Sequence, residues 1–292
     1  MKKIERILSI GVVLALVLSL ATAVYAHKSA STGDAAATSG TTYVLVVGIS
    51  DYRNTDGDCG SGGPDLLYAD DDADAFENAL LTTYNISSAN ITKLKDCPAA
   101  TKIAIENWFT DAATSGGNFT ATANDDIVFF ASGHGTRAFC PNGRVGNAML
   151  VNTGDSLGTI CEDELRGLLD NIGAARKVVL LDISFPSGFR NTFRDASNVL
   201  LITAARGEAR EAAFTDTCAP GRGIFTCWFV ERGILDGEAN SSSLNPHTYN
   251  DPDISGNEIP FEEAYDYVFH NVPPIQKPGI MDNVLNDFLP TD

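Results

Sequence analysis

Short apolar runs alternate along the chain with longer amphipathic stretches. Five runs rich in β-branched and other apolar residues predict strands, at 43–49, 91–95, 126–132, 177–183 and 199–204. Most of these runs are almost continuously apolar, which is typical of strands covered on both faces, because an exposed face would show alternating polar positions.

Amphipathic stretches predict helices between these strands, at 65–82, 98–113 and 162–171, and two more near 223–235 and 260–271. Pro98 suits a helix start, where its missing N–H costs nothing. The order of elements predicts an α/β fold with one open, mostly parallel sheet and helices on both faces. In such a fold the ligand site lies outside the carboxyl ends of the central strands.

The first 26 residues resemble a signal peptide. Three basic residues precede an apolar run at 7–24, and a small-residue sequence ending at Ala26 predicts cleavage there. The apolar run has about 18 residues, near the lower limit for a membrane span, so an uncleaved anchor is the alternative. Residues 27–41 are rich in Ala, Ser, Thr and Gly and predict a flexible leader, which places the folded domain at 42–292.

The chain is strongly acidic, with a formal charge of −18 that becomes about −20 once the signal peptide is removed. A surface of this sign repels phosphate backbones and therefore argues against nucleic-acid partners. Such a surface attracts cations and basic peptide segments. The alternative interpretation is that the negative charge only keeps the protein soluble.

Six cysteines all lie in the exported part, and none forms a C-x-x-C pair of the kind found in zinc or thioredoxin-like sites. An even count outside the cytosol permits disulfides, but their connectivity cannot be deduced from the sequence. For Cys140 and Cys161 we expect a structural thiol or a disulfide.

Two predicted strands end at residues whose side chains could take part in catalysis or binding. The strand at 126–132 ends in Ser132 and continues into Gly133, His134 and Gly135. The strand at 177–183 carries Asp182 next to its last residue and is followed by Ser184. Glycines let main-chain N–H groups approach a ligand closely, while the preceding strand holds the neighbouring side chain rigidly.

These residues resemble the site of caspases and metacaspases, which place a histidine in a Ser-Gly-His-Gly turn and a cysteine after an Asp-x pair. The corresponding positions are His134 and Ser184, and their separation of 50 residues is typical of caspases. The resemblance is to the prokaryotic branch of the family and implies a caspase-like open sheet. It extends over most of the mature chain and includes the segments 43–49, 67–73, 203–206, 223–226 and 276–278.

The resemblance implies roles for individual residues. His134 would be the acid/base, and the main-chain N–H groups of Gly135 and residue 184 would stabilise an oxyanion. Asp72, Ser132 and Asp182 would line a pocket for an Arg or Lys side chain, which two carboxylates can hold by charge-assisted hydrogen bonds. The alternatives are a histidine that merely ends a strand and an acidic helix start around Asp72.

Position 184 departs from the family, because a serine stands where the nucleophilic cysteine belongs. A serine hydroxyl is much harder to ionise than a thiol and needs stronger help from a general base. Three interpretations follow: an engineered knockout, a natural inactive or altered homologue, or a true serine nucleophile. Pro186 is a second departure nearby and removes one main-chain N–H.

The stretch 251–262 approximates a calcium-binding loop, with Asp251, Asp253 and Glu262 as oxygen ligands. A solvated acidic loop and an acidic helix start are the alternatives. The family resemblance also suggests calcium ligands among Asp155, Glu162 and Asp163. No cofactor is required by this chemistry, and Ca²⁺ is the one cation for which the sequence offers a loop.

The sequence thus favours a secreted homologue of cysteine-type endopeptidases that hydrolyses peptide bonds after Arg or Lys, with Ser184 in place of the catalytic cysteine. The alternative is a catalytically inactive secreted module that binds peptide or calcium. The expected partner is a peptide or protein, basic in character, and membrane contact follows only if the signal segment stays uncleaved.

Overall fold

A computed structural model describes residues 40–53, 59, 64–206, 221–240, 258–272, 276–284 and 287–290. The predicted signal peptide, nearly all of the predicted leader, Asp251 and Asp253 lie outside the described residues. Within the described part, no helix combines the length and the hydropathy needed to cross a bilayer.

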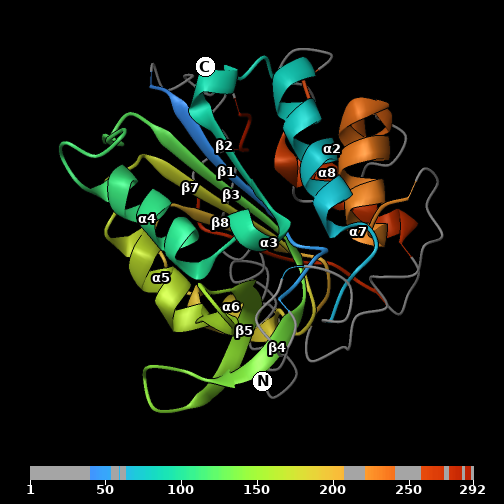
Figure 1. Ribbon diagram of the computed structural model, residues 1–292. Helices are drawn as coiled ribbons and strands as arrows, with labels where there is room; N and C mark the ends of the chain where they lie inside the picture. Colours follow the sequence, from blue (N-terminus) through green and yellow to red (C-terminus); the bar gives the residue numbers. More distant parts are fainter. Residues whose placement is uncertain are drawn as a thin grey trace, which may run out of the picture. The chain divides into compact units, whose positions relative to one another are not determined.

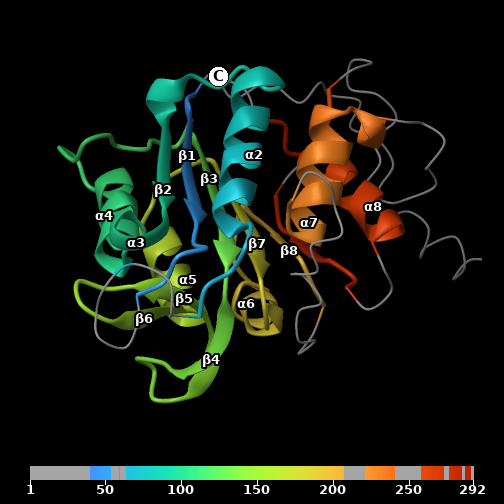
Figure 2. The same ribbon diagram turned by 45° about the vertical axis from the view of Figure 1, so that its right-hand side comes forward.

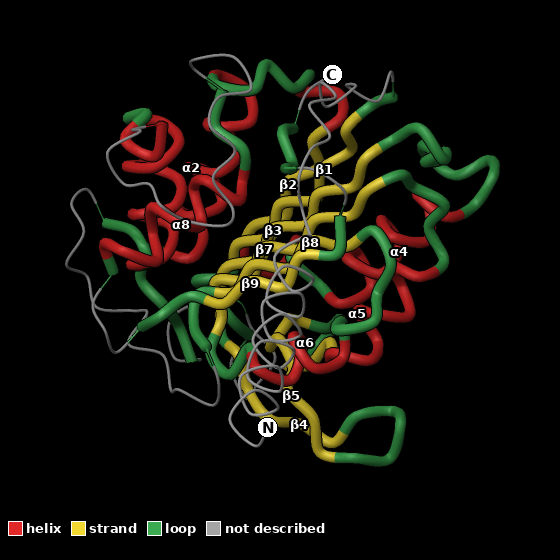
Figure 3. Tube along the Cα trace, turned by 180° about the vertical axis from the view of Figure 1, so that it is seen from behind, coloured by secondary structure: helices red, strands yellow, loops and turns green. Residues whose placement is uncertain are grey.

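A six-stranded sheet forms the centre of the described fold, with strand order β2-β1-β3-β7-β8-β9 (Figures 1 and 3). The first five of these strands pair in parallel, and β9 runs antiparallel to β8. Their bounds are Thr42–Gly48 for β1, Ile91–Lys95 for β2, Asp126–Gly133 for β3, Arg176–Ile183 for β7, Val199–Thr203 for β8 and Gly279–Asp282 for β9. The five predicted strands are therefore confirmed, and β9 is an addition.

Helices cover both faces of this sheet, as Figures 1 and 2 show. One face carries α2 (Ala69–Thr82), α7 (Ile224–Thr226), the π-helical η2 (Cys227–Leu235) and α8 (Phe261–Asn271). The other face carries α4 (Lys102–Ala113), α5 (Glu162–Asp170) and α6 (Ser187–Thr192). Shorter turns are η1 (Ser88–Asn90), α3 (Asp96–Ala99) and η3 (Glu238–Asn240). The prediction of an α/β fold with an open, mostly parallel sheet and helices on both faces is confirmed.

Alternate residues of each central strand belong to different cores. Val44 and Val46 of β1 pack with α2, η2 and α8, whereas Leu45 and Val47 pack with α4, α5 and α6. All four side chains are fully or almost fully buried. Because successive side chains of a strand point to opposite faces, a strand between two helical layers must be apolar at every position. This double burial explains the continuous apolar runs in the sequence.

A second, antiparallel sheet was not predicted. It has the strand order β4-β5-β6, with β4 at Gly135–Phe139, β5 at Val145–Asn152 and β6 at Leu157–Cys161. The β4–β5 hairpin extends beyond the end of the main sheet (Figure 2). Its strands mix buried with exposed positions, and Phe139 and Val145 near the turn are exposed. This mixture hides the pattern that marks the central strands.

The cysteines form disulfides, and Pro98 does not begin a helix. Cys59 is joined to Cys97 and Cys140 to Cys161, while Cys227 is also disulfide-bonded. Helix α4 starts at Lys102, where the N-cap Thr101 accepts a hydrogen bond from the main chain of Ala104 through its side chain. Ala100, with ψ of 69°, and the extended Thr101 leave the helical region between Pro98 and Lys102, so the helix begins only after them.

Strand β2 forms one edge of the main sheet and carries two lysines that pair with helix α2. Lys93 Nζ lies 2.7 Å from one carboxylate oxygen of Asp74, and Lys95 Nζ lies 2.7 Å from the other. Lys95 Nζ also lies 3.3 Å from Asp70 Oδ2. These two lysines and two aspartates are thus held together by partly buried ion pairs.

Candidate functional site

The carboxyl ends of β3 and β7 bring His134 and Ser184 to the same edge of the sheet. The two strands are parallel neighbours that pair Ser132 with Asp182 and Gly133 with Ile183, so the next residue of each chain segment is His134 or Ser184. Gly135 then lies directly against the main chain of residue 184. A Cβ atom added to Gly135 would lie 1.8 Å from the Ser184 carbonyl oxygen and 2.7 Å from its nitrogen.

We expect Gly135→Ala to destabilise the fold and to separate the two strand ends. The methyl group would overlap main-chain atoms of Ser184, which cannot rotate away as a side chain could. Overpacking of this kind costs about 1–3 kcal/mol. Thermal denaturation of the variant checks the expectation, with Gly154→Ala as the control because a Cβ there meets no atom within 4 Å. Equal melting temperatures for the two variants would show that the contact is absent.

His134 is held by contacts from the segment that follows β1. Its main-chain N–H donates a hydrogen bond to Tyr52 Oη at 2.8 Å, and the Tyr52 and His134 rings lie 5.4 Å apart. Its Nε2 lies 2.8 Å from the carbonyl oxygen of Pro64 and must carry the proton in this contact. Nδ1 is therefore the basic nitrogen of the neutral ring.

Burial lowers the pKa of the half-buried His134 below its usual value, and the Pro64 carbonyl and the charge of Asp65 partly offset this effect. The ring is consequently neutral at neutral pH, the state in which a histidine can accept a proton from a nucleophile.

Ser184 stands between a strand and a strained turn. It is buried, with 6% of its surface exposed, and it follows the last residue of β7. Phe185 has φ of 54°, the left-handed region that bulky residues seldom adopt. Pro186 is the N-cap residue of α6. A residue placed at such a strained turn is held in a fixed orientation by the surrounding fold.

Three residues named from the sequence, Asp72, Ser132 and Asp182, meet beside these strand ends. Asp72 Oδ2 accepts a hydrogen bond from Ser132 Oγ at 2.8 Å, and its Oδ1 accepts one from the main chain of Gly223 at 2.9 Å. A Cβ on Gly223 would lie 2.8 Å from Asp72 Oδ2 and 2.9 Å from Asp182 Oδ2. Both carboxylates thus converge on the same small space, and both are fully buried.

Asp182 uses only one of its oxygens within the described part of the chain. Its Oδ2 accepts hydrogen bonds from Thr226 Oγ1 at 2.8 Å and from the Thr226 main chain at 3.2 Å. Its Oδ1 is buried and has no hydrogen-bond partner among the described residues. A buried carboxylate oxygen without a donor is costly, so this atom marks a place where a donor from a ligand would be favourable.

Burial raises the pKa of both carboxyls. The pKa of Asp182 rises to about 6, although the hydrogen bonds from Thr226 oppose the shift. The pKa of Asp72 is raised well above its usual value, first by burial and then by the negative charge of Asp182. Two like charges confined together favour keeping one proton, and a cation placed between them would release it.

Among the described residues, no cluster of oxygen ligands supports the calcium hypothesis. Glu262 is fully buried in the first turn of α8, and its Oε2 accepts a hydrogen bond from the main chain of Phe288 at 2.8 Å. In the described part, the one group with metal-ligand geometry comprises Cys140, Cys161 and Asp163, and its sulfurs are joined in a disulfide. A disulfide has no thiolate to bind a metal. Calcium binding at 251–262 stays a prediction.

The chain was compared with known proteins. No family model and no curated protein matches the sequence. The crystal structure of protein GSU0716 from Geobacter sulfurreducens is similar, with a TM-score of 0.55 and 18% sequence identity, and the alignment covers 82% of this chain and 92% of that chain. A likeness at this level of identity establishes a shared fold and carries no activity from one protein to the other.

Several residues of the site were not identified from the sequence. Tyr52 and Pro64 hold His134, while Gly223 and Thr226 hold the two carboxylates. These four residues come from loops and from a helix start that are remote in sequence from β3 and β7. One signal existed for Tyr52, because a tyrosine at the end of a buried strand brings a hydroxyl that needs a partner.

Proposed function

We propose that this chain is a secreted, caspase-like peptidase homologue that binds a peptide through an Arg or Lys side chain. Asp72 and Asp182 receive the basic side chain, and the carbonyl that follows it is presented to Ser184 and His134. The main-chain N–H groups of Gly135 and residue 184 are the candidates for stabilising the developing oxyanion.

One observation carries this proposal: the pair of buried carboxylates beside the His134 and Ser184 strand ends, with no described residue donating a hydrogen bond to Asp182 Oδ1. Buried carboxylates are normally paired with a cation. A guanidinium offers several N–H donors in a planar fork and is always charged, so it can satisfy both carboxylates at once.

The chemistry at the scissile bond would use this chain's own groups. The residue 184 nucleophile would add to the carbonyl carbon as His134 takes its proton, and His134 would return that proton to the departing amine. Water would then hydrolyse the resulting acyl group by the same proton transfers in reverse. The lowered pKa of His134 keeps it neutral and able to accept the proton, but it also makes the ring a weaker base.

A non-catalytic binding module is the second candidate, and position 184 favours it. A weak imidazole base is poorly matched to a serine hydroxyl and better matched to a thiol. The pocket for the basic side chain does not depend on the nucleophile, so peptide binding would survive without catalysis.

The test measures binding and cleavage separately. Benzamidine, an amidinium probe, should bind the purified protein in calorimetry, and the Ser184→Cys variant should cleave an Arg-terminated fluorogenic peptide much faster than an Asp-terminated one, with and without calcium. Binding without cleavage by the variant would assign the protein to the non-catalytic class. Absence of benzamidine binding would overturn the proposal as a whole.

A further inference from the structure

A buried amide from β5 holds the turn that follows Ser184. Asn147 is 9% exposed, and its Nδ2 donates a hydrogen bond to the carbonyl oxygen of Phe185 and lies 3.4 Å from Ser187 Oγ. The left-handed backbone of Phe185 costs roughly 1–2 kcal/mol relative to the usual regions. Such a conformation persists only where its neighbours fix it, and Asn147 supplies a contact that does so.

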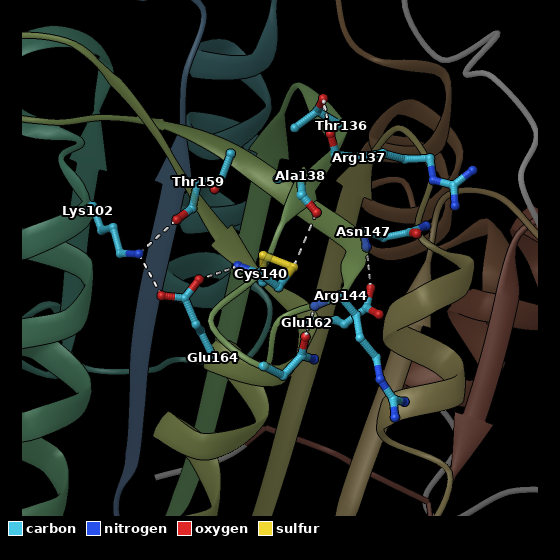
Figure 4. Close-up of a disulfide and its surroundings, with 12 residues drawn as sticks. Lys102, Thr136, Arg137, Ala138, Cys140, Arg144, Asn147, Thr159, Glu162 and Glu164 are labelled. Atoms are coloured by element: carbon cyan, nitrogen blue, oxygen red, sulfur yellow. Dashed lines mark hydrogen bonds and ion pairs between the residues drawn. A yellow bond between two sulfur atoms is a disulfide. The ribbon is translucent and has the colours of Figure 1, made fainter.

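Asn147 is itself fixed from both sides of its strand. Its main-chain N–H donates to Glu162 Oε2 at 2.6 Å (Figure 4). Glu162 directly follows Cys161 at the end of β6, and the disulfide joins Cys161 to Cys140, just beyond β4. Because β4 and β6 are the two neighbours of β5, a covalent bond ties together the strands that flank Asn147.

Helix α6 rests on the same pair of side chains. A Cβ on Gly188 would lie 2.1 Å from Glu162 Oε2 and 2.8 Å from Asn147 Cγ. The absence of a side chain at position 188 therefore gives Asn147 and Glu162 the space that they occupy. Asn147 and Glu162 thus contact the turn at Phe185, Ser187 and Gly188.

We propose that Asn147 is a positioning residue for the nucleophile position. Its amide fixes the peptide of Phe185 and thereby the direction of the residue 184 side chain toward His134, while Glu162 and the disulfide fix Asn147. The inference rests on the proposed function, since the orientation of residue 184 matters chemically only if that residue pairs with His134.

The test uses the thiol of the Ser184→Cys variant as a reporter. Alkylation by iodoacetamide is measured from pH 5 to pH 9, because its rate follows the thiolate fraction. Adding Asn147→Asp replaces the Nδ2 donor with an oxygen that faces the Phe185 carbonyl, while the size of the side chain hardly changes. We expect the alkylation midpoint to rise by about one pH unit and the rate at pH 6.5 to fall roughly tenfold. Asn147→Ala, which removes the donor without adding charge, should give a shift in the same direction.

Asn283→Asp is the matched control, because Asn283 Nδ2 also donates to main-chain carbonyls, of Arg194 at 3.1 Å and Ala196 at 2.8 Å. This variant loses a comparable structural contact away from residues 184–188 and should keep the alkylation profile of Ser184→Cys. Equal profiles for the Asn147 variants and the control would overturn the role of Asn147. If His134→Ala also leaves the profile unchanged, the pairing assumed in the proposed function is at fault.

Discussion

Replacing Asp182 with asparagine is expected to weaken benzamidine binding by roughly 100-fold. The asparagine oxygen can still accept the hydrogen bonds from Thr226, so the change removes the negative charge and leaves the local contacts in place. Truncating one partner of a buried charged pair costs about 2–5 kcal/mol, and about 2.7 kcal/mol corresponds to a factor of 100. Calorimetric titration at pH 8 measures the loss.

Asp71→Asn is the matched control, because Asp71 is next to Asp72 on α2, carries the same charge and is only partly buried. It should bind benzamidine within about twofold of the unchanged protein, as expected for a partly exposed charge that is screened by solvent. The melting temperature of Asp182→Asn should be no lower than that of the parent, because the substitution removes a buried charge. Undiminished binding by Asp182→Asn would remove the carboxylate pair from the proposal.

The pH dependence of this binding follows from the same pair. The pKa of Asp182 is about 6 and that of Asp72 is raised well above its usual value, so protons compete with the probe at acidic pH. Affinity for benzamidine should therefore increase as the pH rises through 6, since the cation prefers ionised carboxylates. A pH-independent affinity between pH 5 and pH 8 would contradict the assignment of these groups.

Glu262→Gln is expected to stabilise the protein at alkaline pH by roughly 3–5 kcal/mol. Burial raises the pKa of Glu262 to about 8 from the usual 4.5, and the charge of Asp287 adds to the shift. Each unit of pKa difference between the folded and unfolded states is worth about 1.4 kcal/mol. Because the folded state holds the proton more tightly, the free energy of unfolding decreases as the pH rises from about 4.5 through 8, and glutamine abolishes that decrease.

Urea unfolding at pH 5 and pH 9 measures this effect. Glutamine retains an oxygen for the hydrogen bond from Phe288, so the two proteins should be similar at pH 5 and should differ at pH 9. The exposed Glu258, four residues earlier, provides the control: Glu258→Gln should change the free energy of unfolding by less than about 0.5 kcal/mol at either pH. Identical pH profiles for Glu262→Gln and the parent would show that Glu262 is ionised in the folded protein throughout.

The fold was largely predictable because the main sheet is buried on both faces. The central positions of strands such as β1 and β3 are apolar on both faces, and few other structures require such a continuous run. Ser132 and Asp182, which the family resemblance assigns to one pocket, lie side by side because β3 and β7 are parallel neighbours, a pairing that the sequence alone did not predict. The antiparallel strands were missed because their half-exposed positions carry a mixed pattern, in which Gly135 and Arg137 look like loop residues.

The supporting residues of the site were less accessible to sequence reasoning. Asn147 lies in β5, a strand of mixed buried and exposed positions, and its partner Phe185 is 38 residues away, so neither residue identifies the other. The strand carries two buried asparagines, Asn147 and Asn152, and a buried amide requires hydrogen-bond partners, which is the signal that the sequence contained. Pro64 contributes only a carbonyl group, which every residue has, and no residue type could have pointed to it.

The lysines of β2 have a consequence for self-association. The outer strand of a sheet offers main-chain groups to which another molecule can add a strand. On this strand Lys93 and Lys95 are engaged by Asp74 and Asp70, and an incoming strand would have to displace water from these ion pairs. Removing water from charged groups is unfavourable, so the pairs oppose strand addition and the fibril growth that it can begin.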